Sequence, residues 1–111
     1  MGKYRVMNKK TIAIIRKWDN EYIAIFPYEL GDYLPYTCMS YMKIGQHGAC
    51  TPDGIVVKSK HTKNDKSQEL KDFISELESI GYDLEIRQRL PSNAVEIRRK
   101  ELQEMAKEDL E

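Results

Sequence analysis

Clusters of hydrophobic residues divide the chain into recognisable elements. Thr11–Trp18 is rich in β-branched residues and has apolar side chains on both faces, a pattern typical of a covered strand. Residues 21–26 repeat this pattern. Asp19 and Asn20 separate the two segments, and both residue types tolerate positive φ, so a tight β-hairpin is predicted. We expect Pro27 to end the second strand because proline has no amide proton to donate to a neighbouring strand.

A helical pattern dominates the second half of the chain. Asp65 with Gln68 resembles a capping box, and Gly81 is placed to supply a left-handed C-cap. Between these signals, apolar residues recur at helical spacing on one face, which predicts an amphipathic helix packed on the sheet. These residues are Leu70, Phe73, Ile74, Leu77 and Ile80.

Weaker patterns lie between the hairpin and this helix. Residues 38–44 predict a third strand. Residues 51–54, with the sequence Thr-Pro-Asp-Gly, predict a turn, because proline and glycine suit the positions of a type I turn. Extended structure then resumes at residues 55–58, and residues 60–63 form a polar linker into the helix.

The last part of the chain predicts one more strand and one more helix. Residues 82–90 alternate apolar and charged side chains, the pattern of a strand with one face in solvent. Pro91 ends this strand. Asn93 with Glu96 is suited to cap a final helix that runs towards Leu110. Its surface carries charges of both signs and only a thin apolar stripe, so we expect an exposed face of mixed charge that includes Arg98, Arg99 and Lys100. The alternative is that the helix docks on a partner or on a second copy of the chain through the apolar stripe of Leu102, Met105 and Leu110.

Together these elements predict an α+β fold. The sheet is mostly antiparallel, with about four to five strands beginning with the hairpin. One amphipathic helix packs on it, and a C-terminal helix follows. We assign residues 1–10 to an N-terminal extension, with Met7 as an alternative start to Met1. Residues 11–90 form the α+β domain and residues 91–111 the charged C-terminal helix.

Composition narrows the function classes. The 111 residues, of which 32% are charged and 41% hydrophobic, suit one folded domain. The formal net charge is zero, which disfavours a globally cationic nucleic-acid binder. No apolar run approaches the roughly 18 residues of a membrane span, and no signal peptide is recognisable. We therefore expect a cytoplasmic protein with reduced cysteines and no membrane partner.

Four residues have side chains that bind zinc: Cys38, His47, Cys50 and His61. Their spacing lacks the paired Cys-x2-Cys and His-x3-5-His clips of zinc sites. The alternative is that Cys38 is a small buried side chain and His61 a solvated one. Cys50 with His47 is a candidate nucleophile and base, but no third group orients the pair. We predict no catalytic residues, no metal and no cofactor.

The glycines that flank Gln46 and His47 indicate backbone geometry that a side chain would obstruct. Residues 45–48 are too short to predict a phosphate-binding loop. Both a functional site and a tight structural turn fit this segment.

Residues 27–37 are unusually aromatic for a connector. One interpretation is a loop that folds over the sheet edge. The other is a contact surface, because tyrosine offers a large contact area at low entropic cost. On the second interpretation the partner-binding residues are Tyr28, Tyr33, Tyr36, Tyr41, Gln46 and His47.

A basic stretch follows the predicted turn. Its lysines are candidates for electrostatic docking: Lys58, Lys60, Lys63 and Lys66. If the strands neighbour one another, Arg16, Lys17, Arg87 and Arg89 extend this patch towards nucleic-acid phosphates. The alternative is a lysine-rich sheet edge that blocks aggregation between strands.

Several short motifs stand out along the chain: the Ile-Ala-Ile-Ile-Arg and Ile-Ala-Ile-Phe-Pro strands, Cys38-x-Ser40-Tyr41, Ile44-Gly45-Gln46-His47-Gly48, and Ile80-Gly81-Tyr82. Over roughly residues 11–90 this pattern resembles small accessory proteins encoded by phages and conjugative elements. They carry no known chemistry, so the resemblance transfers no catalytic residue. It implies a context in which inhibitors of host defence, including anti-CRISPR and anti-restriction proteins, are frequent.

The expected function is therefore a non-enzymatic binding protein of a mobile genetic element. Its expected partner is a host defence nuclease or its ribonucleoprotein complex. The alternative is a nucleic-acid-binding accessory or regulatory protein, and a zinc-binding or thiol enzyme is a third class.

Overall fold

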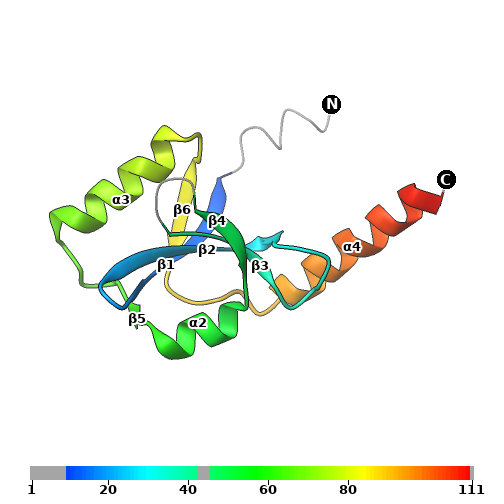
Figure 1. The fold of residues 1–111 in the computed structure, drawn as a ribbon, viewed down its shortest axis with the longest axis horizontal. Coiled ribbons are helices and arrows are strands. Elements are labelled where there is room, and N and C mark those ends of the chain that lie inside the picture. Colours follow the sequence, from blue (N-terminus) through cyan, green and yellow to red (C-terminus); the bar gives the residue numbers. More distant parts are fainter. Residues whose placement is uncertain (1–9, 43–45, 111) are drawn as a thin grey trace.

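The hairpin of β1 (Thr11–Trp18) and β2 (Glu21–Leu30) forms the centre of the sheet in the computed structural model, which describes residues 10–42 and 46–110 (Figure 1). The two strands pair antiparallel, with Ile14 opposite Ile25. Asp19 and Asn20 connect them with φ of 50° and 67°. The predicted hairpin is confirmed, since two consecutive residues with positive φ match the twist of the flanking strands.

The predicted end of the second strand at Pro27 is wrong, because β2 continues to Leu30. Pairing with the next strand shifts register between Phe26, opposite Met39, and Leu30, opposite Cys38. Pro27 lies inside this irregular step, where the regular ladder is interrupted. A proline is tolerated there because no ladder hydrogen bond requires its missing proton.

The remaining strands extend the sheet on both sides of the hairpin. β3 (Cys38–Tyr41) pairs with β2, and β4 (His47–Cys50) forms the edge beyond it. β5 (Lys60–His61) and β6 (Leu84–Arg87) both pair with β1, antiparallel and parallel respectively. The fold is therefore α+β with a mostly antiparallel sheet, as predicted.

Several predictions fall outside the described residues or change in extent. The third strand, predicted for residues 38–44, ends at Tyr41, and residues 43–45 are outside the described part of the chain. Residues 1–9 also lie outside the described part of the chain, so the choice between Met1 and Met7 as the start is not tested. The strand predicted for residues 82–90 is limited to β6, and the polar linker predicted at residues 60–63 begins with the short strand β5.

The predicted turn and extended segment at residues 51–58 are wrong, because α2 (Pro52–Lys58) is a helix. Pro52 stands at the start of this helix, where its missing amide proton is not needed, and Asp53 lies in the first turn. Ile55 is buried against the sheet and donates its N–H to Thr51 O at 3.1 Å. Burial of this apolar side chain favours the helix over the extended form.

The two faces of the sheet carry separate hydrophobic clusters. One contains Ala13, Ile15 and Phe26 and is covered by α3 (Gln68–Ser79). The other contains Ile14 and Ile25 and is covered by α2. In Figure 1 the two helices lie on opposite sides of the strands. The alternation predicted along the first two strands is thus confirmed, with apolar side chains on both faces.

Helix α3 has the predicted apolar face but a different N-cap. Ser67, rather than Asp65, caps it by accepting the N–H of Leu70 at 3.2 Å. The side chain of Gln68 bonds Asp72 instead of closing a capping box. At the other end Gly81 has φ +111°, which confirms the predicted left-handed cap.

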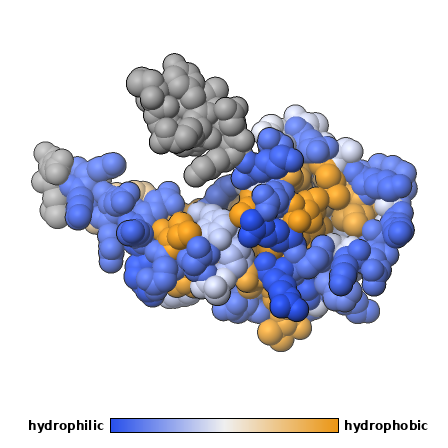
Figure 2. Space-filling model, turned by 180° about the vertical axis from the view of Figure 1, so that it is seen from behind, coloured by the Kyte–Doolittle hydropathy of each residue, from blue (hydrophilic) through white to orange (hydrophobic). Residues whose placement is uncertain are grey.

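Helix α4 (Ala94–Leu110) begins against the sheet and then projects away from it (Figure 1). Ala94 and Arg98, one turn apart, are buried at 4% and 1% exposure, and they face β2. The prediction that Arg98 lies on an exposed charged face is therefore wrong, whereas Arg99 and Lys100 are exposed. Figure 2 shows the opposite view, in which the projecting helix is mostly hydrophilic and the body carries a hydrophobic area ringed by hydrophilic residues.

Candidate protein-binding loop

Residues 31–37, which we call the tyrosine loop, connect β2 to β3. Asp32 organises the loop internally, because its Oδ1 accepts the Leu34 N–H at 2.8 Å and the Thr37 hydroxyl at 2.6 Å. The Thr37 N–H closes the turn by donating to Leu34 O at 3.2 Å. These hydrogen bonds, above all the one from the Thr37 hydroxyl, lower the pKa of Asp32 below its ordinary value. The carboxylate is thus the form that holds the loop.

Arg98 fixes the tyrosine loop from beneath. Its Nε donates to the carbonyl of Pro35 at 2.8 Å, and another guanidinium nitrogen donates to the buried carbonyl of Pro27. One side chain of α4 therefore ties the loop to the irregular end of β2. The planar guanidinium suits this role because it presents several donors in a rigid fork.

Gly31 lets the loop pack closely against the neighbouring strands. A Cβ at this position would lie 2.5 Å from the carbonyl oxygen of Cys38 and 2.8 Å from the Cβ of Ala49. The first of these atoms belongs to the backbone and cannot move aside cheaply. Any larger residue at Gly31 would displace the start of the loop.

The tyrosine loop nevertheless directs large apolar side chains into solvent. Tyr33 is 82% exposed, Tyr36 57% and Leu34 43%. The backbone that carries them is held by Asp32 and Arg98. Fixed backbone and exposed aromatic side chains together are typical of protein-binding surfaces, since little backbone freedom is lost on binding.

The other two predicted tyrosines do not share this position. Tyr28 lies on β2, is half-buried and donates its hydroxyl to Asn93 at 2.7 Å. Tyr41 is 1% exposed, packs in the cluster under α3 and donates to Glu76. Burial leaves Tyr41 no surface for a partner, so we do not keep it in the site.

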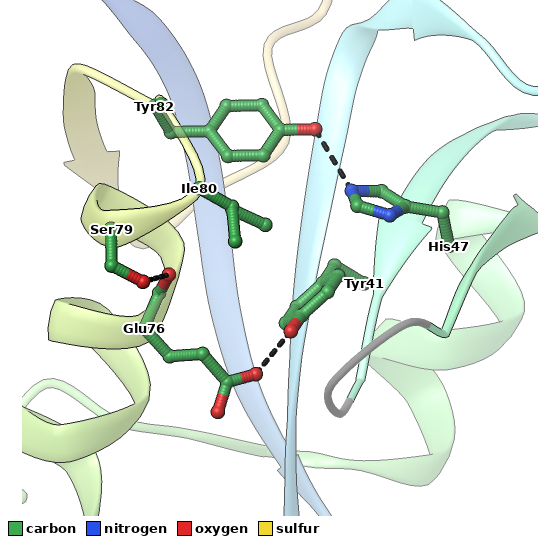
Figure 3. A pocket seen from close by; sticks show the side chains of 7 residues that line it. Tyr41, His47, Glu76, Ser79, Ile80 and Tyr82 are labelled. Carbon is green, nitrogen blue, oxygen red and sulfur yellow. Dashed lines mark hydrogen bonds between the residues drawn. The ribbon is translucent and has the colours of Figure 1, made fainter.

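His47 lies opposite Tyr41, at the other end of the β3–β4 pair from the tyrosine loop, and Gln46 precedes it. In Figure 3 the His47 ring points towards Tyr82. The exposed His47 ring packs on Tyr41, with 4.7 Å between ring centroids, and its Nε2 lies 3.2 Å from the Tyr82 hydroxyl. These residues line an open hollow of about 520 Å³ that Glu76 also borders. Gln46 is exposed beside a second, adjoining hollow.

Gly48 does not need to be glycine on steric grounds. Its φ is not positive, and an added Cβ would meet nothing within 4 Å. The expectation that a side chain would obstruct the backbone is therefore wrong at this position. Gly45, the other flanking glycine, is outside the described residues.

The predicted lysines gather at the opposite end of the hairpin strands. Lys58 and Lys60 line a hollow of about 440 Å³ with Lys17, beside the Asp19–Asn20 turn. The tyrosine loop begins at the other end of β2, a ten-residue strand that spans roughly 30 Å. Lys63 and Lys66 are exposed on the segment before α3. The lysines and the tyrosines therefore form two separate surfaces.

The arginine expected to extend the basic patch serves a structural role. Arg16 donates to Ser59 Oγ at 2.9 Å, to Val56 O at 2.9 Å and to Ser59 O at 2.7 Å. These bonds satisfy carbonyls at the C-terminal end of α2. Arg87 lies on β6, which does neighbour β1, the strand that carries Arg16 and Lys17. Its side chain pairs with Glu85 at 2.6 Å.

The four residues with zinc-binding side chains do not converge. Cys38 and Cys50 are cross-strand neighbours, but His61 lies on β5, at the opposite end of the strand order from β4. His47 and Cys50, three residues apart on one strand, point to opposite faces. Within the described ranges no three His, Cys, Asp or Glu side chains are grouped to hold a metal ion.

Sequence reasoning missed the two residues that shape the tyrosine loop, Asp32 and Arg98. For Asp32 a signal exists, because Asp before a turn commonly accepts a backbone N–H two residues later. For Arg98 the signal is weaker: it follows Ala94 by one helical turn in an otherwise polar segment.

The chain matches no protein-family model, no curated protein and no solved structure. In the described part of the chain, no helix has both the length and the apolar composition to cross a bilayer.

Proposed function

We propose that this chain is a non-enzymatic binding protein that contacts a protein partner through the tyrosine loop. The observation that carries this proposal is the exposure of Tyr33, Leu34 and Tyr36 on a backbone fixed by Asp32 and Arg98. Exposed tyrosines on a fixed loop give a large contact area at a small entropic cost. The resemblance of several short motifs to accessory proteins of mobile elements suggests the partner: a host defence nuclease or its ribonucleoprotein complex, which the chain would inhibit.

The arrangement of the cysteines and histidines also favours binding over catalysis. A thiol nucleophile needs a base within hydrogen-bond reach. Cys50 belongs to the cluster under α2, whereas the His47 ring contacts Tyr41 on the other face of the sheet.

The test is affinity capture with the tagged chain from a bacterial host that carries CRISPR and restriction systems. Half of each sample is treated with nuclease. The wild-type chain is expected to retain a defence nuclease or a subunit of its complex in both halves. The Tyr33→Ala/Tyr36→Ala variant should lose it, because truncating two interface tyrosines commonly costs about 2 kcal/mol or more, which is a roughly 30-fold or greater loss of affinity.

Val57→Ala is the matched control, since Val57 is an apolar residue on α2 with 84% exposure. It should retain the partner. Equal retention by all three proteins would refute the role of the tyrosine loop, and capture of no defence protein would refute the proposed partner class.

A second candidate is nucleic-acid binding at the lysine surface. Lys17, Lys58 and Lys60 line one hollow, which places three ammonium groups where a phosphate could bind. Asp19 borders the same hollow and opposes an anion, so we rank this candidate second.

A further inference from the structure

The two cysteines occupy directly opposed positions on neighbouring strands. Cys38 on β3 pairs with Cys50 on β4, and their Sγ atoms are 3.8 Å apart. Further along the same two strands, the Met42 N–H donates to Gln46 O, so these two residues are a hydrogen-bonded pair. In an antiparallel ladder such pairs recur every second residue, so the pairs Ser40–Gly48 and Cys38–Cys50 are of the same kind. Cys38 and Cys50 are therefore a hydrogen-bonded cross-strand pair, for which the Cα separation is about 5.5 Å.

This geometry lies within the range of natural disulfides. Their Cα atoms are usually about 4.4–6.8 Å apart, most often near 5.5 Å. The backbone of the two strands therefore needs no rearrangement to accommodate a bond. Rotation of the side chains would bring the sulfur atoms from contact to bonding distance.

The two thiols are also chemically distinct. Cys38 is fully buried, whereas Cys50 is half-buried and reachable from solvent. A hydrogen bond from the Cys38 thiol lowers the pKa of Cys50, and the same bond together with burial raises the pKa of Cys38. The thiolate, which is the reactive form, is thus favoured on the more accessible sulfur.

We propose that Cys38 and Cys50 form a redox modification site that closes to an intramolecular disulfide by exchange with a small disulfide such as oxidised glutathione. The Cys50 thiolate attacks one glutathione sulfur, forms a mixed disulfide and expels a glutathione thiolate, which takes up a proton. Cys38 then loses its proton and attacks Cys50 Sγ, which releases the second glutathione. Two protein thiols are oxidised, and one glutathione disulfide is reduced to two thiols.

The disulfide would fix the C-terminal end of the tyrosine loop. Cys38 directly follows the loop, and the space that a side chain at Gly31 would occupy is closed by the Cys38 carbonyl and by Ala49. Closing the bond ties the edge strand β4 to β3 at this point. An effect on partner binding would rest on the proposed function, but formation of the bond does not.

The test uses the full-length chain in glutathione buffers of graded redox ratio, with free thiols alkylated and tryptic peptides weighed. The expected product is a monomer that has lost two hydrogens and yields a linked Cys38–Cys50 peptide. Its Tm should rise by about 10 °C, the order expected for a disulfide that closes a loop of this length, and reductant should reverse the rise.

Single variants separate the two steps. Cys38→Ala should stop at a glutathione adduct on Cys50, whereas Cys50→Ala should leave the buried Cys38 thiol unmodified. The proposal is overturned if the wild-type chain accumulates the Cys50 adduct, forms dimers through Cys50, or retains both thiols in oxidising buffer. These readouts need no partner, so they do not depend on whether the tyrosine loop binds one.

Discussion

Replacing Arg98 by methionine tests whether one buried side chain holds the tyrosine loop in place. Methionine fills much of the space but donates no hydrogen bond, so the carbonyls of Pro27 and Pro35 lose their donor. A buried carbonyl without a partner costs about 1–3 kcal/mol. The bond to Pro27 is buried and the bond to Pro35 only partly so. Removing a desolvated guanidinium offsets part of the cost, and we expect Arg98→Met to lower the free energy of unfolding by about 2–4 kcal/mol.

Arg99→Met is the matched control, because it makes the same chemical change at the next residue of the helix. Arg99 is exposed and pairs with Glu96, also exposed, at 2.6 Å. Such a pair contributes about 0–1 kcal/mol. Urea denaturation followed by circular dichroism measures both variants. A loss of 2–4 kcal/mol corresponds to a fall of about 1–2 M in the urea midpoint. If the two variants have the same midpoint, the buried hydrogen bonds of Arg98 do not stabilise the fold.

Three further predictions concern other parts of the molecule. Gly31→Ala should lower the thermal midpoint by several degrees, because the added Cβ would lie 2.5 Å from a backbone oxygen. Gly48→Ala is the control and should not lower it, because its Cβ would meet no atom within 4 Å. Equal midpoints for the two variants would contradict the close approach at Gly31. Asp65 accepts hydrogen bonds that hold its pKa at about 2, below an unfolded value of roughly 3.9. Its contribution to stability is therefore full above about pH 4 and is lost as the pH falls towards 2, so Asp65→Asn should flatten the dependence of the unfolding midpoint on pH over this window. If the lysine surface binds nucleic acid, Lys58→Glu/Lys60→Glu should weaken binding and reduce its salt dependence in fluorescence anisotropy; binding unchanged by this variant would exclude that surface.

The sequence predicts best the elements whose local signals agree with their burial. The hairpin follows from two β-branched segments around Asp19 and Asn20, and both turn residues have positive φ. Helix α3 follows from apolar spacing and from Gly81, whose cap is completed by the Tyr82 N–H donating to Leu77 O at 3.2 Å. In both cases local geometry and tertiary packing require the same residue types.

Predictions failed where a tertiary contact decided between local alternatives. Pro-Asp-Gly suits a turn, but Pro-Asp also starts a helix well, and burial of Ile55 against the sheet favours the helix α2. Pro27 was expected to end a strand, yet the register shift after Phe26 accommodates it. Neither the packing nor the shift leaves a clear periodic signal in the sequence.

The candidate site was only partly predictable. An aromatic connector indicated a contact surface, and Tyr33 and Tyr36 are indeed exposed on it. Exposure could not be assigned residue by residue, because Tyr41 belongs to a strand face that α3 covers. The role of Arg98 depends on where α4 meets the sheet, which is a contact between residues about 60–70 positions apart.

Hydroxyl-radical footprinting of the chain in complex with its captured partner tests the central claim most directly. Tyr33 and Tyr36 are exposed in the free chain and should lose most of their oxidation in the complex. Met105 on α4, which is 39% exposed, is the internal control and should be oxidised equally in both states. Unchanged oxidation of both tyrosines in a complex that remains intact would contradict the proposal that the tyrosine loop is the binding surface.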